Sequence, residues 1–148
     1  MVRSVFILVP SFDPTGPVKG ACALANILVE RFPVTLVALK DPPHQQQPPV
    51  LKDGVKRCSV ANVKGGRGKL AAYKTLLREA RGATGEKPVS VSLCFSADLI
   101  NAFCASEAAI AASVRSNLFK DYRMGYGLSG LPLALFHFLL LNRFSRVV

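Results

Sequence analysis

The residues best suited to hold a ligand lie in a short segment near the start of the chain. Ser11 and Thr15 provide hydroxyl groups, and Gly16, Pro17 and Lys19 open a stretch with apolar residues at helical spacing. The first turn of a helix exposes free backbone N–H groups and the positive end of the helix dipole. Phosphate and carboxylate groups bind at such places. The sequence therefore predicts an anion-binding loop at residues 10–20.

Two later segments also follow runs that are typical of strands. In the first, Ser96 is placed to cap a helix, and Asp98 lies in the first turn of that helix. The second is a polar and aromatic loop that contains Arg115, Asn117 and Tyr122. Because ligands of parallel α/β sheets bind beyond the carboxyl ends of the strands, we expect these segments and the first loop to face one site. The candidate loops are 10–20, 95–98 and 115–127.

Two common nucleotide-binding motifs are incomplete in this sequence. A dinucleotide-binding turn needs Gly-x-Gly-x-x-Gly, whereas the first loop has only Gly16 and Gly20, interrupted by Pro17. The glycine-rich, basic stretch 62–69 looks like a phosphate loop, but Leu70 stands where that motif needs a hydroxyl group for magnesium. We therefore interpret 62–69 as a flexible loop before a helix.

The histidines and cysteines favour neither a hydrolase nor a metal site. The two histidines are His44, which we interpret as a solvent-facing loop residue, and His137, which we interpret as a packed or interface residue. The four cysteines lack the paired spacing of zinc and redox motifs. They are Cys22, Cys58, Cys94 and Cys104. We predict no metal and no cofactor, and we expect buried thiols in a reducing cytoplasm.

Strand-like and helix-like segments alternate along the 148 residues. Strands are expected at 5–10, 34–39, 55–60, 89–95 and 108–114 and from 144 onward, and helices at 21–32, 70–81, 96–106 and 131–141. This alternation predicts an α/β fold, a Rossmann-like doubly wound sheet that is mainly parallel and has helices on both faces. The length fits a single domain.

The charge balance predicts an anionic partner. Nineteen Lys and Arg residues against nine Asp and Glu residues give a net charge of +10. This surplus suits a nucleotide, a phospholipid head group or a nucleic acid. The expected helix at 131–141 is apolar nearly all round, which leaves two interpretations. It is either buried against the sheet or another domain, or it docks with the basic residues on an anionic membrane surface.

Several segments, taken in order, resemble one family of enzymes. The segment Gly16–Val37 runs from a glycine through a helix that closes with Glu30 and Arg31 into a second strand. Four later segments continue the pattern, namely Phe95–Asn101, Ser113–Asn117, Tyr122 and Arg143–Val148. Together they resemble the amino-terminal half of GT-B-fold glycosyltransferases of the large retaining family that includes many lipopolysaccharide and capsule enzymes. The resemblance covers nearly the whole chain.

The resemblance implies that residues 1–148 form an acceptor-binding N-terminal domain, truncated before a C-terminal domain that holds the nucleotide sugar. The full enzyme would transfer a sugar from that donor to a glycan or lipid-linked acceptor, in the cytoplasm or at the inner face of its membrane. This fragment alone is expected to be inactive. Pro17 replaces the family's second glycine, and Arg115 stands where many relatives carry a histidine. Arg115 either pairs with phosphate or carboxylate or is a surface residue of a basic loop.

A hypothesis from a different class is a stand-alone basic α/β module that binds a nucleotide or a nucleic acid. The aromatic residues Phe95, Phe119, Tyr122 and Tyr126 are not interleaved with basic residues as base-stacking surfaces require, which disfavours nucleic acid. In the glycosyltransferase hypothesis, the residues expected in the donor or acceptor cleft are Ser11, Thr15, Gly16, Pro17, Lys19, Ser96, Asp98, Arg115, Asn117 and Tyr122.

Overall fold

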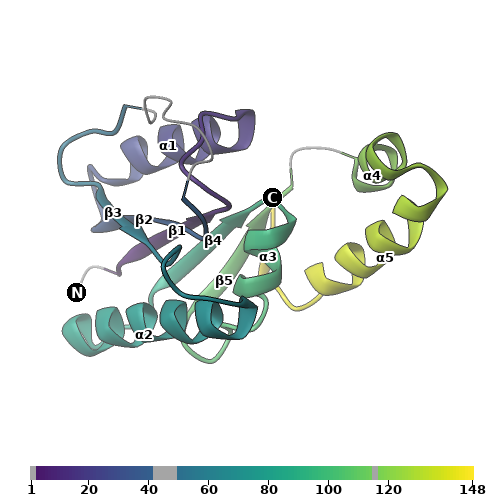
Figure 1. The fold of residues 1–148 in the computed structure, drawn as a ribbon. Coiled ribbons are helices and arrows are strands. Elements are labelled where there is room, and N and C mark those ends of the chain that lie inside the picture. The colour runs from purple at the N-terminus through teal and green to yellow at the C-terminus, as the bar shows by residue number, and fades with distance from the viewer. Residues whose placement is uncertain (1–2, 42–49, 115–116) are drawn as a thin grey trace.

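The computed structural model describes residues 3–41, 50–114 and 117–148. Within them, six parallel strands form one sheet in the order β3-β2-β1-β4-β5-β6 (Figure 1). The order reverses direction between β1 and β4, which confirms the predicted Rossmann-like, doubly wound fold. The strands are β1 (Val5–Val9), β2 (Val34–Ala38), β3 (Lys56–Ser59), β4 (Val89–Leu93), β5 (Ala109–Ser113) and β6 (Arg146–Val147).

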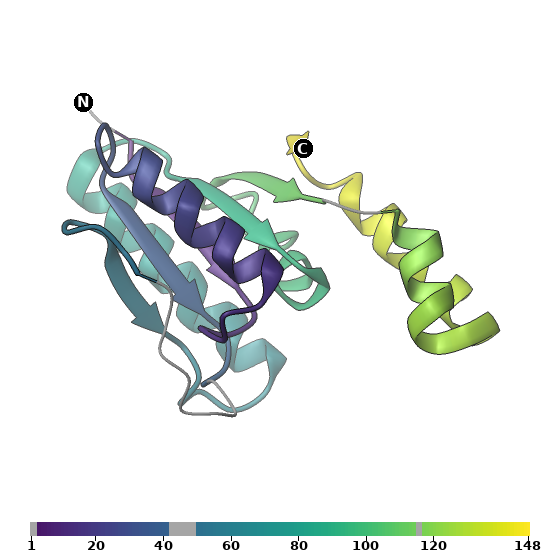
Figure 2. The same ribbon diagram turned by 90° about the horizontal axis from the view of Figure 1, so that it is seen from above.

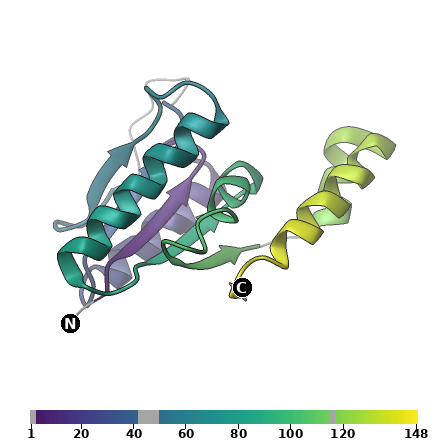
Figure 3. The same ribbon diagram turned by 90° about the horizontal axis from the view of Figure 1, so that it is seen from below.

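Helices cover both faces of the sheet, as predicted. Helix α1 (Gly16–Leu28) packs on one face, where it meets Val5, Ile7 and Val9 of β1. Helices α2 (Gly66–Thr84) and α3 (Phe95–Asn101) lie on the other face (Figures 1 and 3). Because the apolar residues of β1 alternate between the two layers, all of its side chains are buried.

The chain between β5 and β6 folds into a helical hairpin that projects away from the sheet (Figure 2). It consists of α4 (Leu118–Tyr126), a short 3-10 turn η1 (Gly127–Ser129) and α5 (Gly130–Leu141). Gly127 adopts a φ of 63°, which favours glycine. A Cβ atom at Gly130 would lie 2.1 Å from the carbonyl oxygen of Tyr122. The two glycines therefore permit the reversal and the close approach of the two helices.

Several predicted boundaries were wrong. The loop expected at 10–20 ends at Thr15, because Pro17 occupies the first turn of α1, where proline is favoured. The loop expected at 115–127 contains α4, whose first turn is capped by the side chain of Asn117 accepting a hydrogen bond from the Lys120 N–H, 3.1 Å away. Ser96 does not cap α3, because that helix starts one residue earlier, after Cys94.

Two further helices also differ in length from the prediction. Helix α2 begins at Gly66 instead of Leu70, and α3 ends at Asn101 instead of continuing to about 106. His44 lies outside the described residues.

Candidate functional site

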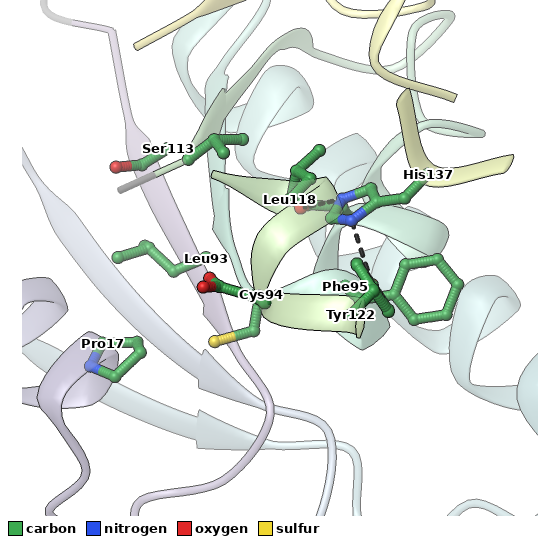
Figure 4. Close-up of a pocket in the computed structure, with 11 residues that line it drawn as sticks. Pro17, Leu93, Cys94, Phe95, Ser113, Leu118, Tyr122 and His137 are labelled. Atoms are coloured by element: carbon green, nitrogen blue, oxygen red, sulfur yellow. Dashed lines mark hydrogen bonds and ion pairs between the residues drawn. The ribbon is translucent and has the colours of Figure 1, made fainter. Parts of the chain in front are cut away.

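A pocket of about 210 Å³ opens beyond the carboxyl ends of β4 and β5, close to where the strand order reverses (Figure 4). Its walls come from the first turn of α1, the turn between β4 and α3, the end of β5 and both long helices of the hairpin. At about 30 Å³ per liquid water, this volume corresponds to roughly seven water molecules. The described residues that line it are Pro17, Leu93, Cys94, Phe95, Asp98, Ser113, Val114, Leu118, Asp121, Tyr122 and His137.

A chain of three polar side chains forms one wall of the pocket. His137 of α5 approaches Asp98 of α3 with its Nε2 atom 2.9 Å from the carboxylate Oδ2 atom. On the other side of the ring, Nδ1 lies 3.1 Å from the hydroxyl oxygen of Tyr122 in α4. Asp98 and His137 are 1% and 3% exposed, so the pair is shielded from water. Residues that are 39 positions apart in the sequence thus form a single buried contact.

The hydrogen-bond network continues between strand β4 and helix α3. The Ser92 hydroxyl donates to the second carboxylate oxygen of Asp98 at 2.6 Å and accepts from the amide nitrogen of Asn101 at 3.1 Å. The Asn101 amide oxygen accepts from Ser90 at 2.6 Å. Since Ser90 gives its only proton to Asn101, the hydroxyl of Tyr73, 2.6 Å away, is the donor to Ser90. Buried polar groups are stable only when paired, and each member of this network has a partner.

The contact of His137 with Asp98 sets the direction of the Tyr122 hydrogen bond. Burial raises the pKa of Tyr122 to about 12, and the nearby Tyr126, Asp98 and Cys94 add to the rise, so the phenol carries its proton. Since the Asp98 carboxylate accepts from Nε2, Nδ1 of the neutral imidazole accepts from the phenol. This arrangement leaves the oxygen lone pairs of Tyr122 free to accept a hydrogen bond from a hydroxyl or amine.

Cys94 stands at the turn between β4 and α3 with a φ of 78°, a conformation that side-chain-bearing residues rarely adopt. Such backbone strain is common at ligand sites. Burial and the charge of Asp98 raise the pKa of the Cys94 thiol. Because the thiolate is the reactive form of cysteine, this site is unsuited to a cysteine nucleophile.

An aromatic cluster holds the hairpin against the same turn. The ring of Phe95 meets the imidazole of His137 edge to face, with 4.9 Å between centroids. It makes similar contacts at 6.2 Å with Tyr122 and with Phe136. Edge-to-face packing of this kind restrains ring orientation. The pocket wall is therefore held by both hydrogen bonds and ring packing.

The structure brings three of the predicted cleft residues to the pocket, namely Pro17, Asp98 and Tyr122. Thr15, Gly16 and Lys19 are exposed around the start of α1 and do not line it. The Ser11 hydroxyl donates to Asp13 at 2.8 Å, while Ser96 lines a different hollow. Asn117 is the cap of α4, and Arg115 lies outside the described residues.

Sequence reasoning missed five polar or aromatic pocket residues, which are Cys94, Phe95, Ser113, Asp121 and His137. His137 is packed, as expected, but its imidazole is also part of the pocket wall. The sequence contains one indication of this role, namely that His137 is the only polar side chain in the otherwise apolar helix α5. A lone polar residue in such a helix needs a buried partner.

A second hollow of about 350 Å³ lies beside the amino end of α2. Gly65, Gly66 and Lys69 line it together with Lys40 and Ser96. The ammonium group of Lys69 donates to the carbonyl oxygen of Leu39, so it is tied to the loop after β2. The glycine-rich stretch was interpreted as a loop before the helix, but its last four residues form the first turn of α2, which places backbone N–H groups next to two lysines.

The described residues contain no group of three or more His, Cys, Asp or Glu side chains placed to hold a metal ion. No model of a known protein family matches the chain, and a search of curated proteins finds no similar sequence.

Proposed function

We propose that this chain is the acceptor-binding N-terminal domain of a GT-B-fold glycosyltransferase, an enzyme that moves a sugar from a nucleotide-sugar donor to a glycan or lipid-linked acceptor. The observation that carries the proposal is the pocket at the carboxyl ends of β4 and β5. It has room for about one sugar ring, and the Tyr122 oxygen and the Ser113 hydroxyl can pair with sugar hydroxyl groups. The ordered resemblance along the sequence supports the same class.

The size of the pocket supports a separate domain for the donor. A nucleotide sugar is larger than this volume, and ligand sites for molecules of drug size occupy about 300–1,000 Å³. In this proposal the acceptor group occupies the pocket, and the donor is held by a further domain across the cleft. Pro17 at the start of α1 would then form the edge of the pocket that faces the donor.

The proposal is tested by NMR titration of the isotope-labelled chain with a panel of mono- and disaccharides at millimolar concentration. We expect shift changes centred on Phe95, Ser113 and Tyr122, and we expect no turnover of nucleotide sugars by residues 1–148. Tyr122→Phe should weaken binding several-fold, whereas Lys69→Gln in the other hollow should leave it unchanged. Sugar transfer by this chain alone, or saccharide shifts that avoid the pocket, would overturn the proposal.

A second candidate is a nucleotide-binding module, favoured by the hollow that contains Lys40 and Lys69 at the amino end of α2. It predicts that nucleotides raise the thermal unfolding midpoint and that Lys69→Gln abolishes the rise. A shift that depends on Lys69 without any saccharide response at Tyr122 would replace the first proposal with this one.

A further inference from the structure

Helix α5 presents most of its apolar side chains to solvent. Its buried stripe consists of Gly130, Ala134, His137, Leu140 and Leu141. Phe136, Phe138 and Leu139, by contrast, are 49%, 50% and 55% exposed. In a soluble helix the outer face is normally polar, whereas α5 is apolar on its outer face as well as along its buried stripe.

The exposed apolar surface continues around the tip of the hairpin. Met124, Tyr126 and Leu128 are exposed there, next to Leu131 and Leu135 of α5. We call this surface the apolar hairpin face, and its members are Met124, Tyr126, Leu128, Leu131, Leu135, Phe136, Phe138 and Leu139. A contiguous apolar surface of this kind marks an interaction site.

The charges on and after the hairpin indicate which partner fits. The hairpin carries two basic residues, Lys120 and Arg123, against one acidic residue, Asp121, and two further basic residues, Arg143 and Arg146, follow it. All four basic residues are exposed. A surface that combines exposed apolar side chains with flanking basic groups suits the interface of a bilayer with anionic head groups.

The dimensions favour docking over spanning. By length and composition alone, Leu118–Leu141 is apolar enough to cross a membrane, and 28% of its 18-residue apolar window is buried. The chain reverses at Gly127, however, and α5 has 12 residues. At 1.5 Å per residue α5 is about 18 Å long, well short of the roughly 30 Å hydrocarbon core.

We propose that the apolar hairpin face docks on the surface of an anionic lipid bilayer, with α5 lying in the interfacial plane and the basic residues of the hairpin at the head groups. A second copy of this chain is a poorer occupant, because a symmetric contact would bring equal positive charges together. The inference stands independently of the proposed glycosyltransferase activity, since it rests on the outer surface of the hairpin.

The first test is co-sedimentation of the chain with vesicles of phosphatidylcholine alone or mixed with phosphatidylglycerol. We expect binding to the anionic vesicles that weakens with added salt. Leu135→Glu and Phe138→Glu should each reduce binding at least tenfold. The matched control is Ile27→Glu, since Ile27 is 67% exposed in the last turn of α1, and that end of the helix points away from the hairpin (Figure 2).

Charge reversal separates the electrostatic part of the docking. Arg123→Glu should weaken binding at least fivefold, because each basic residue near an anionic membrane contributes about that factor. Lys64→Glu, at an exposed position before α2, should have a much smaller effect. Equal losses in the two variants would mean that net charge alone drives the binding, and would overturn the assignment to the hairpin.

The depth at which a residue enters the bilayer can be measured by tryptophan fluorescence. Because the chain contains no tryptophan, a single introduced one gives an unambiguous signal. Phe138→Trp should be quenched by brominated lipids, whereas Ile27→Trp should not. Three results would each overturn the proposal: no vesicle binding, equal quenching at both positions, or a dimer in solution that Leu135→Glu dissociates while vesicles have no effect. Thermal unfolding of each variant checks that the fold is retained.

Discussion

The sheet with its covering helices and the helical hairpin differ in how much of their apolar surface they bury. In the sheet, every residue of β1 is apolar and buried. In the hairpin, the only polar side chain of α5, His137, is 3% exposed, whereas Phe138 and Leu139 are about half exposed. Burial of apolar surface therefore accounts for the cohesion of the sheet. The hairpin is attached in a different way.

The hairpin is attached by a small polar and aromatic contact as well as by the buried Leu140 and Leu141. Asp98 of α3 is hydrogen-bonded to His137 of α5, and His137 is hydrogen-bonded to Tyr122 of α4. The ring of Phe95 in α3 packs edge to face on both His137 and Tyr122. Because buried hydrogen bonds with an ionised partner are directional, this contact sets the orientation of the hairpin as well as its stability. The same side chains form a wall of the pocket, so the pocket depends on the hairpin being in place.

The largest effect is expected from Asp98→Ala, which removes one partner of the buried pair. His137 and Ser92 would each lose a hydrogen bond to the carboxylate, and breaking a buried charged contact costs about 3–5 kcal/mol. The free energy of unfolding, measured with urea, should fall by about that amount. The NMR signals of the hairpin should also broaden.

Two control variants distinguish the loss of the Asp98–His137 contact from the loss of side-chain volume at position 98. Asp98→Asn keeps the shape and some hydrogen bonds, so it should lose clearly less stability than Asp98→Ala. The double variant Asp98→Leu with His137→Leu replaces both polar partners with apolar groups and should recover part of the loss. A loss below about 1 kcal/mol for Asp98→Ala would show that the polar contact does not hold the hairpin.

Leu36→Ala tests the sheet by the same measurement. Leu36 of β2 is fully buried against α1, and truncation of a buried leucine costs about 2–5 kcal/mol through lost burial and the cavity that remains. We expect a loss near 3 kcal/mol in urea denaturation, with the hairpin signals unaffected until the whole chain unfolds. Selective release of the hairpin in this variant would contradict the distinction between the two regions.

The strands were largely predictable because their residues carry the information locally. Parallel strands covered on both faces are continuous apolar runs, and β1 and β2 have this pattern. Helix α4 was not predictable in the same way. Its sequence is polar and contains Gly125, and it forms next to α5 with Asn117 as its cap. Tertiary packing can override weak local preference.

The pocket was predictable in part, for a related reason. Pro17, Asp98 and Tyr122 lie in the first or second turn of helices that follow strands, which is close to where the fold class places ligands. His137 lies in the middle of a helix, and its role depends on contact with Asp98, 39 residues away. Sequence spacing does not encode such a contact. A lone histidine among apolar residues indicates only that some partner exists.

Tyr122→Phe should have a smaller effect than either core variant. It removes the hydroxyl that donates to Nδ1 of His137 but keeps the ring that packs on Phe95. One neutral hydrogen bond contributes about 0.5–1.5 kcal/mol, so we expect a loss of about 1 kcal/mol. In the wild-type chain, a pH titration followed by ultraviolet absorbance should also contain a tyrosine that ionises near pH 12, and this step should vanish in Tyr122→Phe.

The smallest effect is expected from Leu135→Ser on the outer face of α5. Leu135 is 50% exposed, so the substitution removes little buried surface, and exposed substitutions usually change stability by less than about 0.5 kcal/mol. Urea denaturation should give a curve close to that of the unmodified chain, in contrast to Leu36→Ala. If Leu135→Ser instead cost as much as Leu36→Ala, the outer face of α5 would be buried in solution. The contrast between the hairpin and the sheet would then be wrong, because both regions would bury their apolar side chains to a similar extent.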